Sequence, residues 1–239
     1  MVGYIIALII AILLIRLVHT EMESFGHNPL PGYVFAGMFL ASVWFHPYCL
    51  SHIAMLMLVL SYFPLFESYE TENPPLYSLL IYLCLGVASL FLPVILWMVP
   101  FFIASQIILR SLTIKSGAAT IFGLLAPWLW KWTIDLCFDY DITSFAGKDS
   151  PSDGIGSWNF CSISVLVLFM IFLFVLWRFR NRPLSSRSKT RIIHRIIILL
   201  SLASFLLILI FPGSFRTFYG IALVNTSILI GSLLLGRTI

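Results

Sequence analysis

The sequence predicts an all-α integral membrane protein, a polytopic transmembrane helical bundle of about nine spans with one leading helix and four helical hairpins. Two observations predict this class. Hydrophobic residues make up 60% of the 239-residue chain and charged residues only 10%, whereas a soluble domain carries about a quarter charged residues. Apolar segments that could cross a ~30 Å hydrocarbon core also recur along the chain. With so little polar surface, the surrounding solvent must be lipid.

The leading helix is predicted over residues 1–18, MVGYIIALIIAILLIRLV. A secretory signal peptide is the alternative for an apolar segment at this place. That alternative requires basic residues before the apolar stretch and a small-x-small cleavage site after it, and the segment has neither. Arg16 lies at the wrong end for such a role. We therefore interpret the segment as a membrane span.

Residues 28–66 and 74–109 are each predicted to fold back as a helical hairpin. Residues 74–109 contain no Asp, Glu, Lys, Arg or His. As one helix they would extend about 54 Å, which is too long for a single crossing. Pro93 is the expected break because an interior proline removes a helix hydrogen bond. Pro47 marks the corresponding turn in the first hairpin.

The two hairpins begin with related segments. ESFGHNPLPGY at 23–33 and ESYETENPPLY at 67–77 share Glu, Ser, an aromatic residue, Pro and Tyr in register. This similarity predicts a duplicated hairpin, with copies near 23–66 and 67–110. The alternative is chance similarity between apolar segments of common composition.

Four more apolar segments complete the predicted bundle of nine spans. If one short segment enters and leaves the membrane on the same side, the total is eight spans. All are expected to belong to a single membrane domain over residues 1–239. An irregular outer loop is expected at 139–157, where Gly, Ser and Pro are frequent. The four segments are residues 120–138, 159–177, 191–211 and 219–235.

The orientation is predicted from a basic loop at residues 178–191. Short loops with many Lys and Arg residues stay on the cytoplasmic side of a membrane. With nine spans, the N-terminus lies outside and the C-terminus lies in the cytoplasm of a cell with an inner (cytoplasmic) membrane. The outer loop at 139–157 carries four Asp and one Lys, which suits a translocated segment.

The same basic loop is the candidate contact for lipid headgroups or a partner protein. Anionic headgroups attract such residues by about 1 kcal/mol each. The alternative is pairing with acidic residues on the same side, namely Glu21, Glu23, Glu67, Glu70 and Glu72. We expect membrane lipids and other envelope membrane proteins as partners, and no nucleic acid. The contact residues are Arg178, Arg180, Arg182, Arg187, Lys189 and Arg191.

Lys131 and Asp135 lie one helical turn apart inside a predicted span. Ionisable groups within a span indicate function by default. Tryptophans at 128, 130 and 132 surround them, so an aromatic belt with a lysine reaching toward the headgroups is the alternative. If both side chains face the bundle interior, they could bind a phosphate or a proton. The candidate functional polar cluster is Lys131, Asp135, His46 and His52.

Two short motifs suggest metal or sugar chemistry. WFHPYCLSH at 44–52 spaces His46, Cys49 and His52 by three, and such residues bind zinc or copper. No fourth ligand is evident nearby, so we predict no metal site and interpret the motif as a polar turn.

Glu21 and Glu23 resemble the acidic pair of glycosyltransferases that use polyprenyl-linked sugars. The predicted topology places this pair on the wrong side, so no catalytic residue and no cofactor are predicted.

Three polar features remain. Cys137 and Cys161 flank the outer loop and could form a disulfide in an oxidising periplasm. Cys84 is expected to be a small packing residue in mid-membrane. Gln106 and Asn225 lie within predicted spans. Either could hydrogen-bond across helices for about 0.6 kcal/mol.

The stretch from residue 88, ASLFLPVILWMVPFFIASQIILRSLTIKSGAATIFGLLAPWLWKW, carries a resemblance. It resembles an uncharacterised family of multi-pass inner-membrane proteins from Bacteroidota. The shared features are an Ala-Ser-Leu-Phe…Pro helix, an apolar return ending in Arg, and a Gly-Leu-Leu-x-Pro helix. The resemblance implies a location in the inner membrane and implies no activity.

Three functions are compatible with these features. The first is a non-enzymatic scaffold or subunit in cell-envelope assembly, favoured by the scarcity of charge within the spans. The second is a transporter or flippase-like handler of a lipid-linked substrate, favoured by the repeated hairpins. The third is a polyprenyl-dependent membrane glycosyltransferase, which rests on Glu21 and Glu23 alone. The balance is against an enzyme.

Overall fold

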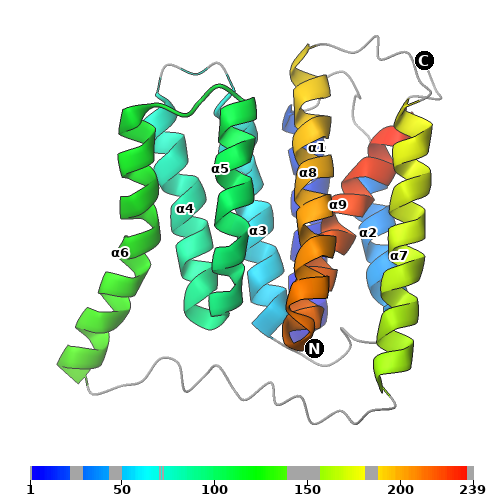
Figure 1. Cartoon of the computed structure of the whole chain (residues 1–239), viewed down its shortest axis with the longest axis horizontal. Coiled ribbons are helices and arrows are strands. Elements are labelled where there is room, and N and C mark those ends of the chain that lie inside the picture. Colours follow the sequence, from blue (N-terminus) through cyan, green and yellow to red (C-terminus); the bar gives the residue numbers. More distant parts are fainter. Residues whose placement is uncertain are drawn as a thin grey trace. The chain divides into compact units, whose positions relative to one another are not determined.

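The computed structural model describes residues 2–21, 29–42, 50–69, 71, 73–138, 157–180 and 188–235, whose regular structure is entirely helical (Figure 1). The predicted all-α helical bundle is therefore confirmed. Two short 3₁₀ helices, η3 and η5, accompany the α-helices. In chain order the elements are α1 (Val2–Glu21), α2 (Leu30–Ala41), α3 (Leu50–Glu67), α4 (Pro74–Phe91), η3 (Pro93–Met98), α5 (Val99–Ile108), α6 (Ile114–Phe138), α7 (Ser157–Arg180), α8 (Ser188–Ile210), η5 (Pro212–Ser214) and α9 (Phe215–Leu235).

The chain is a multi-pass membrane protein by the length and composition of its helices. Five helices, namely α1, α3, α4, α8 and α9, are long and apolar enough to cross a membrane. The helix α2, the η3–α5 stretch and residues 163–179 of α7 are shorter apolar helices. Many large apolar side chains are exposed, such as Leu8 on α1 and Phe122 on α6. Hydrocarbon chains are the solvent that suits such a surface.

The predicted break at Pro93 is confirmed. Helix α4 ends at Phe91, and Leu92 takes an extended conformation with φ −137° and ψ 91°. Pro93 then opens η3 at the first helical position, where a missing N–H costs nothing and the fixed φ is suitable. Because a 3₁₀ helix rises ~2.0 Å per residue against 1.5 Å for an α-helix, η3 and α5 together reach about 27 Å.

Helix α4 lies at the centre of one compact unit, Leu50–Lys148, and packs against both α3 and α6 (Figure 1). Glycines allow α4 and α6 to approach each other closely. A Cβ built on Gly86 would lie 2.9 Å from Pro127 Cγ and 3.1 Å from the Gly123 carbonyl oxygen. Small residues that let two backbones approach are typical of helix contacts in membranes.

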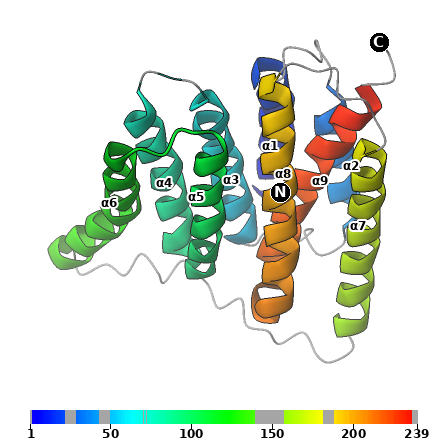
Figure 2. The same ribbon diagram turned by 45° about the horizontal axis from the view of Figure 1, so that its top comes forward.

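Helix α9 lies at the centre of the other compact unit, which comprises Met1–Cys49 and Asp149–Ile239. It contacts α2, α7 and α8 (Figure 2), and most of its described residues are buried. Two glycines again bring helices together, since a Cβ on Gly231 would overlap Pro31 and one on Gly32 would lie 2.7 Å from the Ala11 carbonyl oxygen. The hydroxyl groups of Thr226 and Ser227 donate to carbonyls of their own helix.

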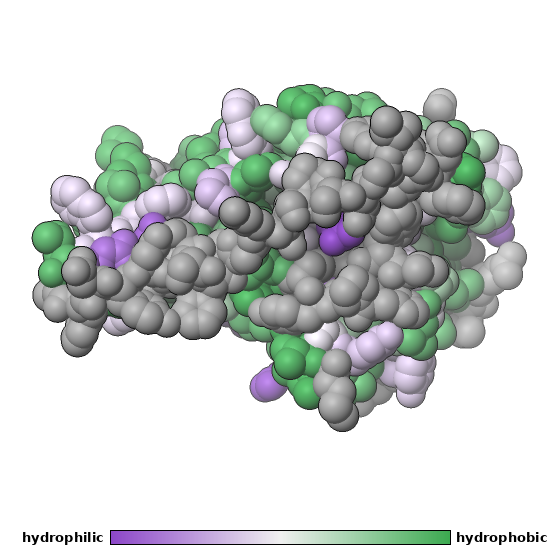
Figure 3. Space-filling view, turned by 90° about the horizontal axis from the view of Figure 1, so that it is seen from below, coloured by the Kyte–Doolittle hydropathy of each residue, from purple (hydrophilic) through white to green (hydrophobic). Residues whose placement is uncertain are grey.

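The predicted single membrane domain and the duplicated hairpin stay predictions. The unit division places α2 and α3 in different compact units, while α4 and α5 lie in the same one. Each unit has its own apolar surface. In Figure 3 hydrophobic residues alternate with hydrophilic ones over the coloured part of the face seen.

Candidate functional site: the polar cluster on α6

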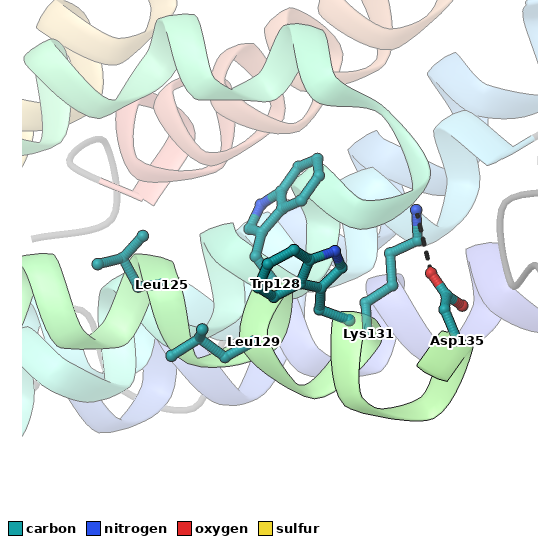
Figure 4. Close-up of a pocket in the computed structure, with 6 residues that line it drawn as sticks. Leu125, Trp128, Leu129, Lys131 and Asp135 are labelled. Carbon is teal, nitrogen blue, oxygen red and sulfur yellow. Dashed lines mark ion pairs between the residues drawn. The ribbon is translucent and has the colours of Figure 1, made fainter. Parts of the chain in front are cut away.

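Lys131 and Asp135 form an ion pair on α6 (Figure 4). The Lys131 Nζ lies 3.9 Å from Asp135 Oδ2, and the side chains are 18% and 30% exposed. The four-residue spacing places the two groups on one face of the helix. A pair of this kind neutralises both charges locally, which lowers the cost of holding them against an apolar surface.

Trp128 attaches this cluster to the neighbouring helix α4. The Lys131 Nζ lies 5.9 Å from the centre of the Trp128 ring, within the range of a cation–π contact. The Trp128 indole N–H donates to Ser89 Oγ at 3.0 Å. Ser89 in turn donates to the Gly86 carbonyl at 2.7 Å. The cluster is therefore held against α4 shortly before the break at Pro93.

A shallow depression of about 480 Å³ lies beside the ion pair (Figure 4). All of its lining residues belong to α6, so it is a groove on the surface of one helix, open to the surroundings. Two tryptophans of this region, Trp130 and Trp132, are 77% and 70% exposed. The arrangement can present an ammonium and a carboxylate to an amphiphilic molecule. The lining residues are Leu125, Trp128, Leu129, Lys131, Trp132 and Asp135.

Of the two histidines of the predicted cluster, the structure describes only His52. His52 is fully buried in the first turn of α3 and is not among the lining residues. His46 and Cys49 lie outside the described residues. Within the described part of the chain, no group of three His, Cys, Asp or Glu side chains could hold a metal ion.

The described residues of the predicted basic contact, Arg178, Lys189 and Arg191, lie where α7 ends and α8 begins. The end of α7 and the start of α8 lie at one end of the unit built around α9, together with the end of α1 (Figure 1). Arg191 is exposed, while Arg178 and Lys189 are half-buried. The side chain of Arg180 is not described, and Arg182 and Arg187 lie outside the described residues.

The remaining predicted groups fall mostly beyond what the structure describes. Cys137 and Cys161 lie at the end of α6 and the start of α7, and their side chains are not described. Their pairing stays a prediction. Cys84 is a free, half-buried thiol in α4. Glu23 lies outside the described residues, as does the side chain of Glu21.

Gln106 forms the interhelical hydrogen bonds that the sequence predicts, with two partners that it does not reveal. The Gln106 Nε2 donates to Ser78 Oγ at 3.0 Å, and the Tyr82 hydroxyl donates to Gln106 Oε1 at 3.3 Å. All three side chains are fully buried. Ser78 and Tyr82 lie four residues apart on α4, which is the signal that could have identified them.

Comparisons of the chain with protein-family models, curated proteins and solved structures found no match. The resemblance to the Bacteroidota membrane family therefore stays a prediction.

Proposed function

We propose that this protein is a non-enzymatic scaffold or subunit of a cell-envelope assembly in an inner membrane. One observation carries the proposal. Among the described side chains, the buried polar ones are hydroxyls, Gln106, Asn225 and two histidines, with no Asp, Glu, Lys or Arg. Catalysis and ion coupling within a membrane ordinarily use buried charged groups. A core of uncharged groups is better suited to holding helices together.

The proposed orientation has the N-terminus outside and the C-terminus in the cytoplasm. It is supported by the cations Arg178, Lys189, Arg191 and Arg195, which lie where α7 ends and α8 begins. Basic residues at a helix start are repelled by the positive end of the helix dipole, which costs electrostatic free energy. Attraction to an anionic cytoplasmic leaflet would offset that cost at the start of α8.

The test is purification of the full chain from its own membrane, with and without brief crosslinking in cells, followed by mass spectrometry of proteins and lipids. We expect one or more membrane proteins in near-stoichiometric amount. Recovery of the chain without any such partner, together with enrichment of a single lipid class, would contradict the proposal. A parallel preparation of Gly123→Ala, which we expect to weaken the α4–α6 contact, shows whether recovery of a partner depends on the packing of this unit.

The α6 groove supports a second candidate, the handling of a lipid-linked or other amphiphilic substrate. Lys131 and Asp135 could meet a headgroup there while Trp128 and Trp132 contact its apolar part. A test is the translocation of fluorescent phospholipid in proteoliposomes. This candidate requires that Lys131→Gln and Asp135→Asn each slow translocation and that Thr133→Ala, on the exposed face of the same helix, does not. Translocation no faster than in empty liposomes counts against it.

A further inference from the structure

The corner between α5 and α6 holds a residue in an unfavourable backbone conformation. Arg110 has φ 57° and is the one non-glycine residue with positive φ in the described part of the chain. Its N–H donates to the Ile107 carbonyl at 3.0 Å, and the Ser111 N–H donates to the Gln106 carbonyl at 3.1 Å. This is the Schellman arrangement, whose left-handed position is ordinarily occupied by glycine. A bulky cation here points to a use for the side chain.

The corner is a fixed structure. Ser111 is buried, and its hydroxyl lies 3.4 Å from both Ser68 Oγ of the α3 end and the Gln106 carbonyl. At the start of α6, Thr113 and Ser116 exchange side-chain hydrogen bonds with each other's N–H, at 2.6 and 3.1 Å. This capping box occupies those amide donors. An anion at this corner would therefore be bound by side chains and not by these backbone N–H groups.

Two exposed cations are available there. Arg110 and Lys115 are both exposed, and neither forms an ion pair or a side-chain hydrogen bond with any other described residue. Arg110 precedes α6 and Lys115 lies in its first turn, whereas the Lys131–Asp135 pair lies near the other end of that helix. Among the described residues, no carboxylate forms an ion pair with either side chain, and both side chains are exposed to a ligand from outside.

Two apolar side chains project between these cations. Ile114 is 96% exposed and Leu112 is 40% exposed. The η3–α5 stretch before this corner is one of the shorter apolar helices, and the end of such a helix suits the boundary between headgroups and acyl chains. At that depth apolar side chains enter the hydrocarbon while Lys and Arg remain at the phosphate level.

We propose that the corner Arg110–Lys115 is a binding site for an anionic phospholipid. Arg110 and Lys115 contact its phosphate, and Leu112 and Ile114 contact its acyl chains. The Arg110 guanidinium suits a phosphate because its planar fork can donate two parallel hydrogen bonds. This site is separate from the α6 groove and does not depend on the scaffold function.

The test uses the 239-residue chain in uncharged detergent. Native mass spectrometry follows lipid binding as phosphatidylglycerol or phosphatidylcholine is titrated in. Arg110→Gly and Lys115→Gln should each weaken phosphatidylglycerol binding about fivefold, the equivalent of one headgroup contact. Binding of phosphatidylcholine should not change. Arg216→Gln removes the same charge at the start of α9 and should leave phosphatidylglycerol binding as in the parent protein.

A structural role for Arg110 gives different results. If its side chain holds the fold, for example by pairing with an acidic residue of the chain, Arg110→Gly unfolds at a lower temperature in lipid-free detergent. The lipid site instead predicts an equal or higher unfolding temperature, since glycine tolerates positive φ. A lower temperature, or unchanged phosphatidylglycerol binding in both variants, overturns the proposal.

A soluble anion is distinguished by its lack of acyl chains. Glycerol 3-phosphate should bind far more weakly than phosphatidylglycerol, and Ile114→Ser should weaken only the lipid. Equal binding of glycerol 3-phosphate and phosphatidylglycerol would identify a soluble phosphate site and overturn the lipid proposal.

Discussion

Gly86 of α4 and Gly123 of α6 meet so closely that a Cβ on Gly86 would lie 3.1 Å from the carbonyl oxygen of Gly123. The close approach of the two helices continues along α4, since a Cβ on Gly123 would lie 2.8 Å from the Leu79 carbonyl oxygen. Backbone atoms cannot move aside as a flexible side chain can. The packing of α6 on α4 therefore depends on the absence of these two side chains.

Gly123→Ala should destabilise the unit around α4 by about 1–3 kcal/mol, because the methyl group overpacks the contact. Gly117→Ala is the matched control on the same helix, since a Cβ there meets nothing within 4 Å. The control should be neutral or stabilising by about 0.5–1 kcal/mol. Thermal unfolding in detergent measures both, and equal midpoints for the two variants would refute the close contact.

A second glycine pair tests the packing of α1 on α2. Gly32→Ala should destabilise by about 1–3 kcal/mol, because its Cβ would lie 2.7 Å from the Ala11 carbonyl oxygen. Gly37, also on α2, has open space around its Cβ position, so Gly37→Ala should not destabilise. Denaturation in mixed micelles compares the two. The packing described for α1 and α2 is wrong if Gly37→Ala proves the more damaging substitution.

The buried hydrogen bond between Gln106 and Ser78 should be measurable by a double-mutant cycle. Gln106→Leu and Ser78→Ala are made singly and together, and the free energy of unfolding is measured for each. We expect a coupling energy of about 0.6 kcal/mol, as is typical of hydrogen bonds between membrane helices. Ser105→Ala is the control, because the Ser105 hydroxyl bonds to Phe101 of its own helix. Additive effects of Gln106→Leu and Ser78→Ala would show that the pair does not interact.

Trp128→Phe should lose the hydrogen bond to Ser89 and destabilise the α4–α6 contact by about 0.6–1.7 kcal/mol. Trp130→Phe should have little effect, because that ring is 77% exposed. In the background of Ser89→Ala, the Trp128→Phe change should cost less. Unfolding followed by fluorescence of the remaining tryptophans gives these values, and a larger cost for Trp130→Phe would argue against the anchoring role of Trp128.

The proposed orientation predicts the labelling of engineered cysteines in cells. Ser152→Cys lies in the predicted outer loop and should react with a membrane-impermeant maleimide from outside the inner membrane. Ser185→Cys lies in the basic loop and should react only after that membrane is opened. Both positions lie outside the described residues, and the parent protein measures labelling of its native cysteines. The reverse pattern would invert every side assignment.

The positions of the helices could be predicted because they depend on local properties of the chain. The length of an apolar segment and the place of Pro93 decide where a helix begins and ends, whatever it packs against. The same rule has limits, since Pro64 and Pro127 lie inside α3 and α6 without ending them. Neighbouring helices can satisfy the backbone groups that such prolines leave without a partner.

The sequence alone determined that this chain is helical, apolar and suited to a membrane, because composition and segment length require no knowledge of packing. Only the tertiary structure decided which side chains meet. It pairs Gln106 with Ser78 and Tyr82, seats Gly123 against Leu79, and leaves His52 buried away from Lys131. The physical reason is that helices in lipid associate through close packing and a few hydrogen bonds. Those contacts join residues far apart in the chain. A pattern of apolar residues does not indicate which residue of one helix faces which residue of the next.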